Sequence, residues 1–218
     1  MSDAPSSPLL QIHRPDGTLA SGRTRPRATP RKGDICDLCA TSLVEPHSHL
    51  ADLVSRSLLC VCRPCFLLFL PEGAAQGRYR PVPERYVALS TTDGARWDRL
   101  DIPIGLAFLF YNSAIGRVAA LYPSPAGATE STLPLDAWSD MIASAPELLT
   151  LAPDVEAVLV RQTRGHHDTY IVPIDACYEL AGIVRRDWKG FDGGDVAARA
   201  IDAFFDRIRS RSQAVVTP

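Results

Sequence analysis

The sequence predicts an α+β protein, in which a small zinc-ribbon-like unit with four cysteines precedes a four-stranded mixed sheet covered by three helices (ββαββαα). Two observations support this prediction. Five of the six cysteines fall between residues 36 and 65, and after residue 101 paired apolar runs alternate with stretches of helical periodicity. With 46% hydrophobic residues among 218, the chain can form one sizeable core and a satellite unit.

The chain divides into four parts by composition. Residues 1–33 are rich in Pro, Ser, Gly and Arg and predict a disordered basic tail, because such a segment buries too little apolar surface to offset its ordering entropy. Residues 34–70 form the four-cysteine unit, and residues 71–100 are a Pro- and Gly-punctuated connector with one candidate strand at 86–90. Residues 101–211 form the α+β domain.

Charge and hydropathy exclude several function classes. A formal net charge of only -2 gives no basic field to hold nucleic acid or an anionic membrane. There is no apolar run of membrane-spanning length and no secretory signal, so we expect a cytoplasmic protein. In that reducing compartment the clustered cysteines predict metal thiolates rather than disulfides.

The metal motif is a pair of CxxC turns, Cys36 to Cys39 and Cys62 to Cys65, with 22 residues (40–61) between them. Each turn directs two sulfurs to one point, and two such turns give the tetrahedral four-thiolate cage that zinc prefers. Cys60 is an alternative ligand, because it lies on the same face as Cys62 if that stretch is extended. His47 and His49, in the loop between the pairs, would allow a mixed site.

Iron, alone or in an iron–sulfur cluster, is the alternative to zinc, since rubredoxin-like carriers also use two CxxC turns. Redox sites of that kind direct backbone N–H groups at the sulfurs, and Pro64 removes one such donor from the second turn. Ala40 stands where a glycine would help the first turn. These features favour zinc, and four protein sulfurs leave no open position for a substrate, which predicts a structural site.

The α+β domain begins with a predicted hairpin, 104–111 with 118–122, followed by the Pro- and Gly-rich loop 122–131. This loop is either a rigid strand-to-helix connection or an anion-binding segment. Pro134 opens a short helix that ends before Pro146. A second hairpin, 155–160 with 170–174, turns at residues 165–168.

Two further helices complete the domain. Asp175 can cap the first, whose apolar stripe is Cys177, Leu180, Ala181 and Val184. The second carries an apolar face made of Ala197, Ile201, Phe204, Phe205 and Ile208. We expect the helices to cover one face of the sheet.

No catalytic site is predicted. His166, His167 and Asp168 fall at the expected hairpin tip, where polar residues are usual, and Cys177 is expected in the core. The chain has no hydrolase, kinase or dinucleotide signature.

Several stretches together resemble an uncharacterised bacterial family encoded beside actinobacterial-type nickel–iron hydrogenase genes. The similar stretches are residues 36–39, 47–50, 60–65, 105–108, 122–131, 172–178 and 188–190. The resemblance covers roughly residues 34–210 and implies a role around the assembly or electron supply of a hydrogenase. We therefore expect a non-enzymatic, zinc-binding accessory protein that docks on a hydrogenase subunit or maturation factor. The alternative is a rubredoxin-like or iron–sulfur electron-transfer protein serving the same system.

Overall fold

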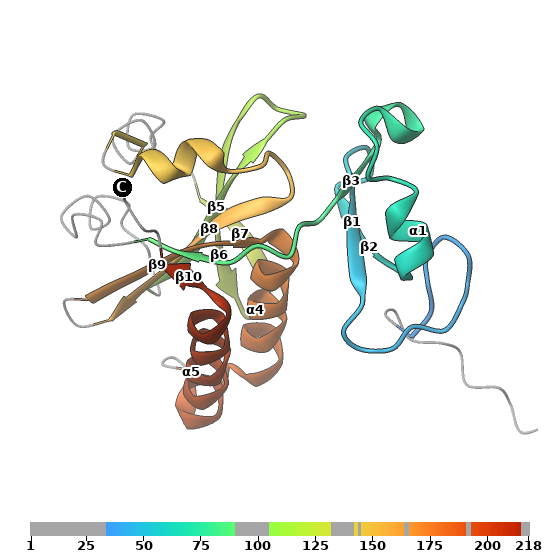
Figure 1. Ribbon diagram of the computed structural model, residues 1–218. Coiled ribbons are helices and arrows are strands. Elements are labelled where there is room, and N and C mark those ends of the chain that lie inside the picture. The colour runs from blue at the N-terminus through green and yellow to red at the C-terminus, as the bar shows by residue number, and fades with distance from the viewer. Residues whose placement is uncertain are drawn as a thin grey trace, which may run out of the picture. The chain divides into compact units, whose positions relative to one another are not determined.

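The computed structural model describes residues 34–89, 105–131, 142–143, 145–163, 166–190 and 193–214 (Figure 1). The predicted basic tail at 1–33 and most of the predicted helix after Pro134 lie outside these residues. All of the described residues belong to one unit, 32–218. Their strands form two sheets, of three and seven strands.

The three-stranded sheet belongs to the four-cysteine unit. Its order is β2-β1-β3, with β1 at Ser48–Asp52, β2 at Ser57–Val61 and β3 at Tyr79–Pro81, all antiparallel. A short helix, α1 (Arg63–Leu67), follows β2, and a 3-10 turn, η1 (Ala74–Gly77), precedes β3. Leu50, Val61 and Phe66 form a small core with Cys36 and Cys65.

The β1–β2 hairpin is held at its turn by a buried carboxylate. Asp52 Oδ1 accepts hydrogen bonds from the backbone N–H groups of Val54 and Ser55, at 3.0 and 3.2 Å. The guanidinium of Arg78 donates to both oxygens of Asp52, with an Nη2–Oδ2 distance of 2.7 Å. This pairing lowers the pKa of Asp52 well below its usual range. The turn and β3 are thereby tied together.

The second sheet has the strand order β10-β4-β9-β8-β5-β6-β7. The expectation of a four-stranded sheet was wrong, because three further strands add to the two predicted hairpins. The strands are β4 (Val87–Ala88), β5 (Leu106–Asn112), β6 (Arg117–Ser124), β7 (Gly127–Ser131), β8 (Glu156–Thr163), β9 (His166–Pro173) and β10 (Gln213–Ala214). Among the strand pairs of the described residues, only β10 and β4 are parallel, so the sheet is mostly antiparallel.

The 122–131 segment is a hairpin rather than a strand-to-helix loop. Tyr122 in β6 pairs with Thr129 in β7, and the side chains of Ser124 and Thr129 share a hydrogen bond of 3.0 Å. Gly127 has a φ of 118°, which allows the tight turn between the strands. Two hydroxyls of the segment that was considered for anion binding are therefore bonded to each other across the hairpin.

The sheet is covered on both faces. Helices α4 (Ile174–Asp187) and α5 (Gly194–Arg211) pack on one face, and both predicted apolar stripes are buried there. On the other face, Ala107, Leu109 and Val158 pack with Ala145 and with Leu148 of the 3-10 turn η2 (Pro146–Thr150), and Ile142 from the end of the predicted helix packs against them. The expectation that all helices share one face was therefore wrong. The central strands are apolar on both sides, so both sides need cover.

The connector supplies strands to both sheets, β3 to the first and β4 to the second. Arg80 donates to Asp154 (Nη1–Oδ2, 3.0 Å). Arg85 makes a two-pronged pair with the buried carboxylate of Glu156, at 2.7 and 2.8 Å. These charge-assisted bonds fix the connector to the start of β8. None of the helices in the described part of the chain has the length and apolar character to span a bilayer.

Candidate metal centre

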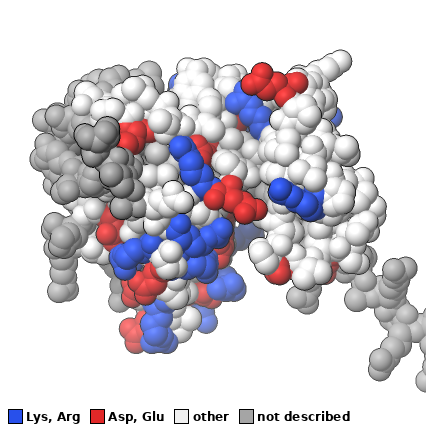
Figure 2. Space-filling view, viewed as in Figure 1, with Lys and Arg blue, Asp and Glu red and all other residues white. Residues whose placement is uncertain are grey.

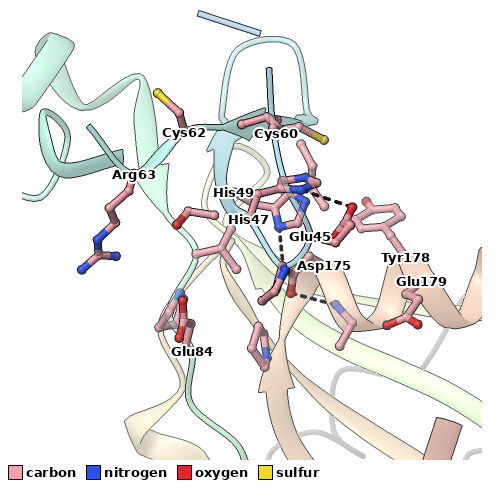
Figure 3. A pocket seen from close by; sticks show the side chains of 18 of the residues that line it. Glu45, His47, His49, Cys60, Cys62, Arg63, Glu84, Asp175, Tyr178 and Glu179 are labelled. Carbon is pink, nitrogen blue, oxygen red and sulfur yellow. Dashed lines mark hydrogen bonds and ion pairs between the residues drawn. The ribbon is translucent and has the colours of Figure 1, made fainter. Parts of the chain in front are cut away.

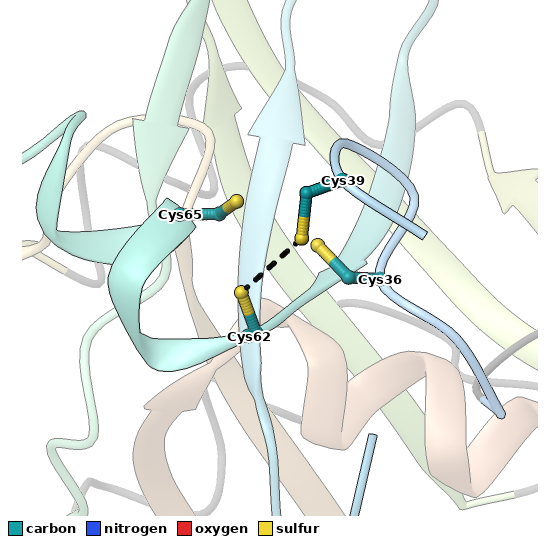
Figure 4. Close-up of side chains that lie close together, drawn as sticks. All are labelled: Cys36, Cys39, Cys62 and Cys65. Atoms are coloured by element: carbon teal, nitrogen blue, oxygen red, sulfur yellow. Dashed lines mark hydrogen bonds between the residues drawn. The ribbon is translucent and has the colours of Figure 1, made fainter. Parts of the chain in front are cut away.

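Four cysteine side chains converge in the four-cysteine unit. The sulfurs of Cys36, Cys39, Cys62 and Cys65 all lie within 4.8 Å of one another, and Cys39 Sγ is 3.6 Å from Cys62 Sγ. Figure 4 shows the four side chains pointing toward a shared centre. A regular tetrahedron with metal–sulfur distances of about 2.3 Å has sulfur–sulfur edges of about 3.8 Å. The group is therefore compact enough to bind a single metal ion.

The first CxxC turn is closed by backbone hydrogen bonds. Ala40 N–H donates to Cys36 O at 2.9 Å, and Cys36 N–H donates to Thr41 O at 2.7 Å. Ala40 has a φ of 58°, the left-handed conformation that glycine adopts without penalty. The expectation that a glycine would help this position is consistent with that geometry. The left-handed residue reverses the chain just after Cys39, so that Thr41 O meets the N–H of Cys36.

The second pair is set by the start of a helix. Cys62 is the N-cap residue of α1, and Pro64 occupies the first helical turn, where a missing N–H costs nothing. Phe66 N–H donates to Cys62 O at 2.9 Å, which closes the turn that carries Cys65. The helix thus directs both sulfurs back toward the first turn.

Asp37 joins the first CxxC turn to β2. Its carboxylate accepts the N–H of Cys60 at 2.7 Å, and its own N–H donates to Cys60 O at 2.9 Å. This two-way bridge fixes the end of β2 against the first CxxC turn. Asp37 was not predicted as a site residue, because its partner Cys60 lies 23 residues away and no local pattern indicates their contact.

The thiols differ in acidity. The Thr41 hydroxyl and backbone N–H lower the pKa of the exposed Cys39 thiol to about 6. Burial opposes ionisation of Cys36, but hydrogen bonds from the backbone of Cys62, Cys39 and Leu38 outweigh it and lower its pKa. Burial raises the pKa of Cys65. At least part of the group is thus poised to bind metal as thiolate near neutral pH.

Cys60, the alternative ligand, lies in a different group. The structure places it with His47 and His49, whose ligand atoms and the Cys60 sulfur lie within 4.8 Å of one another. The alternation that would have put Cys60 and Cys62 on one face stops because β2 ends at Val61 and the chain turns into α1 at Cys62. The two histidines are therefore not grouped with the four cysteines either.

The remaining predicted residues are dispersed. His166, His167 and Asp168 lie in β9 instead of at the hairpin tip, and their strand pairs with β8 up to Thr163. Cys177 is fully buried on α4, and burial raises the pKa of its thiol well above the usual value. Asp175 lies one position inside α4, whose N-cap is Pro173, and the Asp175 side chain contacts His49.

The match to a family model covers residues 35–212, from the first CxxC turn to the end of α5. The chain belongs to the family of unknown function DUF5947. No curated protein and no solved structure matches it. For this DUF5947 chain, the geometry of the site is accordingly the main guide to function.

Proposed function

We propose that the chain is a non-enzymatic accessory protein of the cytoplasm, in which a zinc ion held by Cys36, Cys39, Cys62 and Cys65 organises a surface for docking another protein. The observation that carries the proposal is the convergence of four sulfurs within 4.8 Å. Four thiolates would complete a tetrahedral zinc ion and leave no position for a substrate. Such a site stabilises structure and does not catalyse.

The compactness of the group favours a single ion. In an iron–sulfur cluster the four cysteines bind different iron atoms, which holds the sulfurs further apart than around one ion. The second turn also favours zinc over a redox iron, because Pro64 lacks the N–H that would stabilise a thiolate there. Rubredoxin-like iron remains the alternative, since Cys36 accepts hydrogen bonds from three backbone groups.

Exposed leucines lie close in sequence to the cysteine ligands and support a docking role. Leu67, Leu68 and Leu70 follow Cys65 and expose 45%, 68% and 51% of their surface, and Leu38 lies within the first turn at 39%. Figure 2 shows few charged side chains on the visible face of the four-cysteine unit, whereas both signs intermix over α4 and α5. An apolar patch of this kind is typical of protein interaction sites.

The sequence resemblance directs the choice of partner to a nickel–iron hydrogenase subunit or a factor that matures it. The docking proposal predicts that Leu68→Glu weakens binding to such a partner by tenfold or more while metal content is unchanged. Binding to the purified subunit would be measured by calorimetry. Val196→Glu on the exposed face of α5 is the matched control, because Val196 is also an exposed aliphatic side chain but lies on the α+β domain.

Metal analysis tests the site itself. We expect about one zinc per chain and no visible absorption in protein purified without oxygen and without added metal. Cys39→Ser and Cys65→Ser should lose the metal, and Cys177→Ser, a matched buried thiol outside the group, should keep it. One iron per chain together with thiolate-to-iron absorption bands would contradict the zinc assignment and support the electron-transfer alternative. Unchanged metal in both ligand variants would remove the assignment altogether.

A further inference from the structure

A second cluster of metal-ligand side chains lies on the opposite side of the β1–β2 hairpin from its small core. His49 and Cys60 are directly paired across the two strands, and His47 precedes His49 by two residues, so all three lie on one face. One ring nitrogen of each histidine and the sulfur of Cys60 lie within 4.8 Å of one another. Figure 3 shows the three side chains grouped at the cleft.

Each imidazole has a carboxylate at the same nitrogen. Nδ1 of His49 lies 2.8 Å from Oδ2 of Asp175 on α4, and Nδ1 of His47 lies 3.2 Å from Oε1 of Glu45. The close contact with Asp175 holds a proton on Nδ1 of His49 and leaves Nε2 of that ring with a free lone pair. Histidines that bind metals almost always have such a partner, because it fixes the tautomer and raises the basicity of the other nitrogen.

His47 is buried without satisfying its polar atoms. Its side chain is only 7% exposed, and neither ring nitrogen has an aligned hydrogen-bond partner among the described residues. A buried polar atom left in this way has lost its hydrogen bonds to water without replacement, at a cost in free energy. A metal ion bound at Nε2 would remove that cost, and the neighbouring ring of His49, 4.8 Å away between centroids, would bind the same ion.

We propose that His47, His49 and Cys60 form a second metal site, separate from the four cysteines, for a divalent ion of the zinc type. Two imidazoles and one thiolate suit zinc and its analogue cobalt. Three protein ligands leave a fourth position for water or an exchangeable ligand. The three side chains line a cleft together with Tyr178, Glu179 and Arg207. The proposal holds whichever metal the four cysteines bind.

The test is a cobalt titration of the full chain after one equivalent of zinc has filled the four-cysteine group. We expect one equivalent of cobalt to bind in addition to the zinc. Its spectrum should show a thiolate-to-cobalt absorption band and visible bands as intense as those of tetrahedral cobalt. His47→Gln and Cys60→Ser should lose this equivalent and retain the first zinc. His167→Gln and Cys177→Ser are the matched controls, and both should bind two metals.

A third variant separates ligation from folding. Asp175 lies on α4, outside the hairpin, and asparagine keeps an Oδ1 that can accept the Ala176 N–H while it removes the carboxylate at His49. We expect Asp175→Asn to keep the two-metal stoichiometry and weaken the second ion by about 10–100-fold. Absence of a second equivalent in the unmodified protein would overturn the proposal. It would also be overturned if His47→Gln and Cys60→Ser bound cobalt as well as the controls, or if Cys60→Ser lost the first zinc.

Discussion

Replacing one cysteine of the four-cysteine group should unfold the four-cysteine unit, with its three-stranded sheet, and leave the seven-stranded sheet intact. Cys65→Ser removes a buried ligand whose helix also closes the small core. The magnitude follows from what else stabilises that unit. Leu50, Val61 and Phe66 are its three large buried side chains among the described residues, and their burial contributes about 5–9 kcal/mol together.

The metal contributes more than this core does. Structural zinc supplies about 10–16 kcal/mol in zinc-finger peptides. Since each 1.4 kcal/mol is a factor of ten in an equilibrium constant, losing even about 10 kcal/mol shifts the opening equilibrium of the unit by about 10⁷. Apolar burial alone cannot replace that loss, so the hairpin should open.

Hydrogen exchange measures this directly. Amides that pair β1 with β2 should be protected in the metal-bound protein and exchange at the rate of an unfolded chain in Cys65→Ser. Amides that pair β8 with β9 should keep their protection, because they lie in the other sheet and pack under α4 and α5. Cys177→Ser should leave the β1–β2 amides unchanged. Metal-free Cys65→Ser protein whose β1–β2 amides stay within tenfold of the unmodified rates would refute the reasoning.

Three smaller perturbations test other parts of the structure. Glu156→Ala should lower the free energy of unfolding by about 2–4 kcal/mol, measured by urea titration, because it leaves the Arg85 guanidinium and the Ala152 N–H without their carboxylate. An unchanged urea midpoint would contradict the role of the Arg85–Glu156 pair. Ala40→Gly should raise the free energy of unfolding by up to about 1 kcal/mol and slow the loss of zinc to a chelator, since the φ angle of residue 40 is positive. Faster zinc loss would show that Ala40 does not strain the turn. The pKa of Asp52 is lowered by Arg78 in the folded state, so its stabilisation is present above about pH 4 and fades as pH falls below that. The stability difference between the unmodified protein and Asp52→Asn should therefore shrink from pH 5 to pH 2.5, and a constant difference would argue against the ion pair.

Local patterns predicted the parts of the fold that local sequence controls. The CxxC spacing identified the four cysteines that the structure brings together. Helical periodicity identified the buried faces of α4 and α5, including Phe204 and Phe205, which lie in the largest core. Alternating apolar runs located β5, β6, β8 and β9 to within a few residues.

Long-range pairing accounts for most of what could not be predicted. β4 falls within the candidate strand predicted at 86–90, but its pairing with β9 and β10 was not predicted. β10 has only two residues and lies more than 120 residues after β4 in the sequence, so no local pattern indicates it. β7 follows a segment with prolines at 123 and 125, which reads locally as a loop. The grouping of His49 with Cys60 depends on the register of the β1–β2 hairpin, which local composition does not specify.

The division of the connector between two sheets affects the order in which a new chain can fold. The four-cysteine unit is complete in sequence once β3 has been made, because β1, β2, α1 and both CxxC turns precede it. β4 follows almost at once, but its partners β9 and β10 are synthesised only after β5 to β8, and α4 with Asp175 comes late as well. Non-local strand pairing of this kind is slow. A chain leaving the ribosome can therefore fill its four-cysteine site early, whereas the carboxylate that supports His49 arrives only when the α+β domain closes.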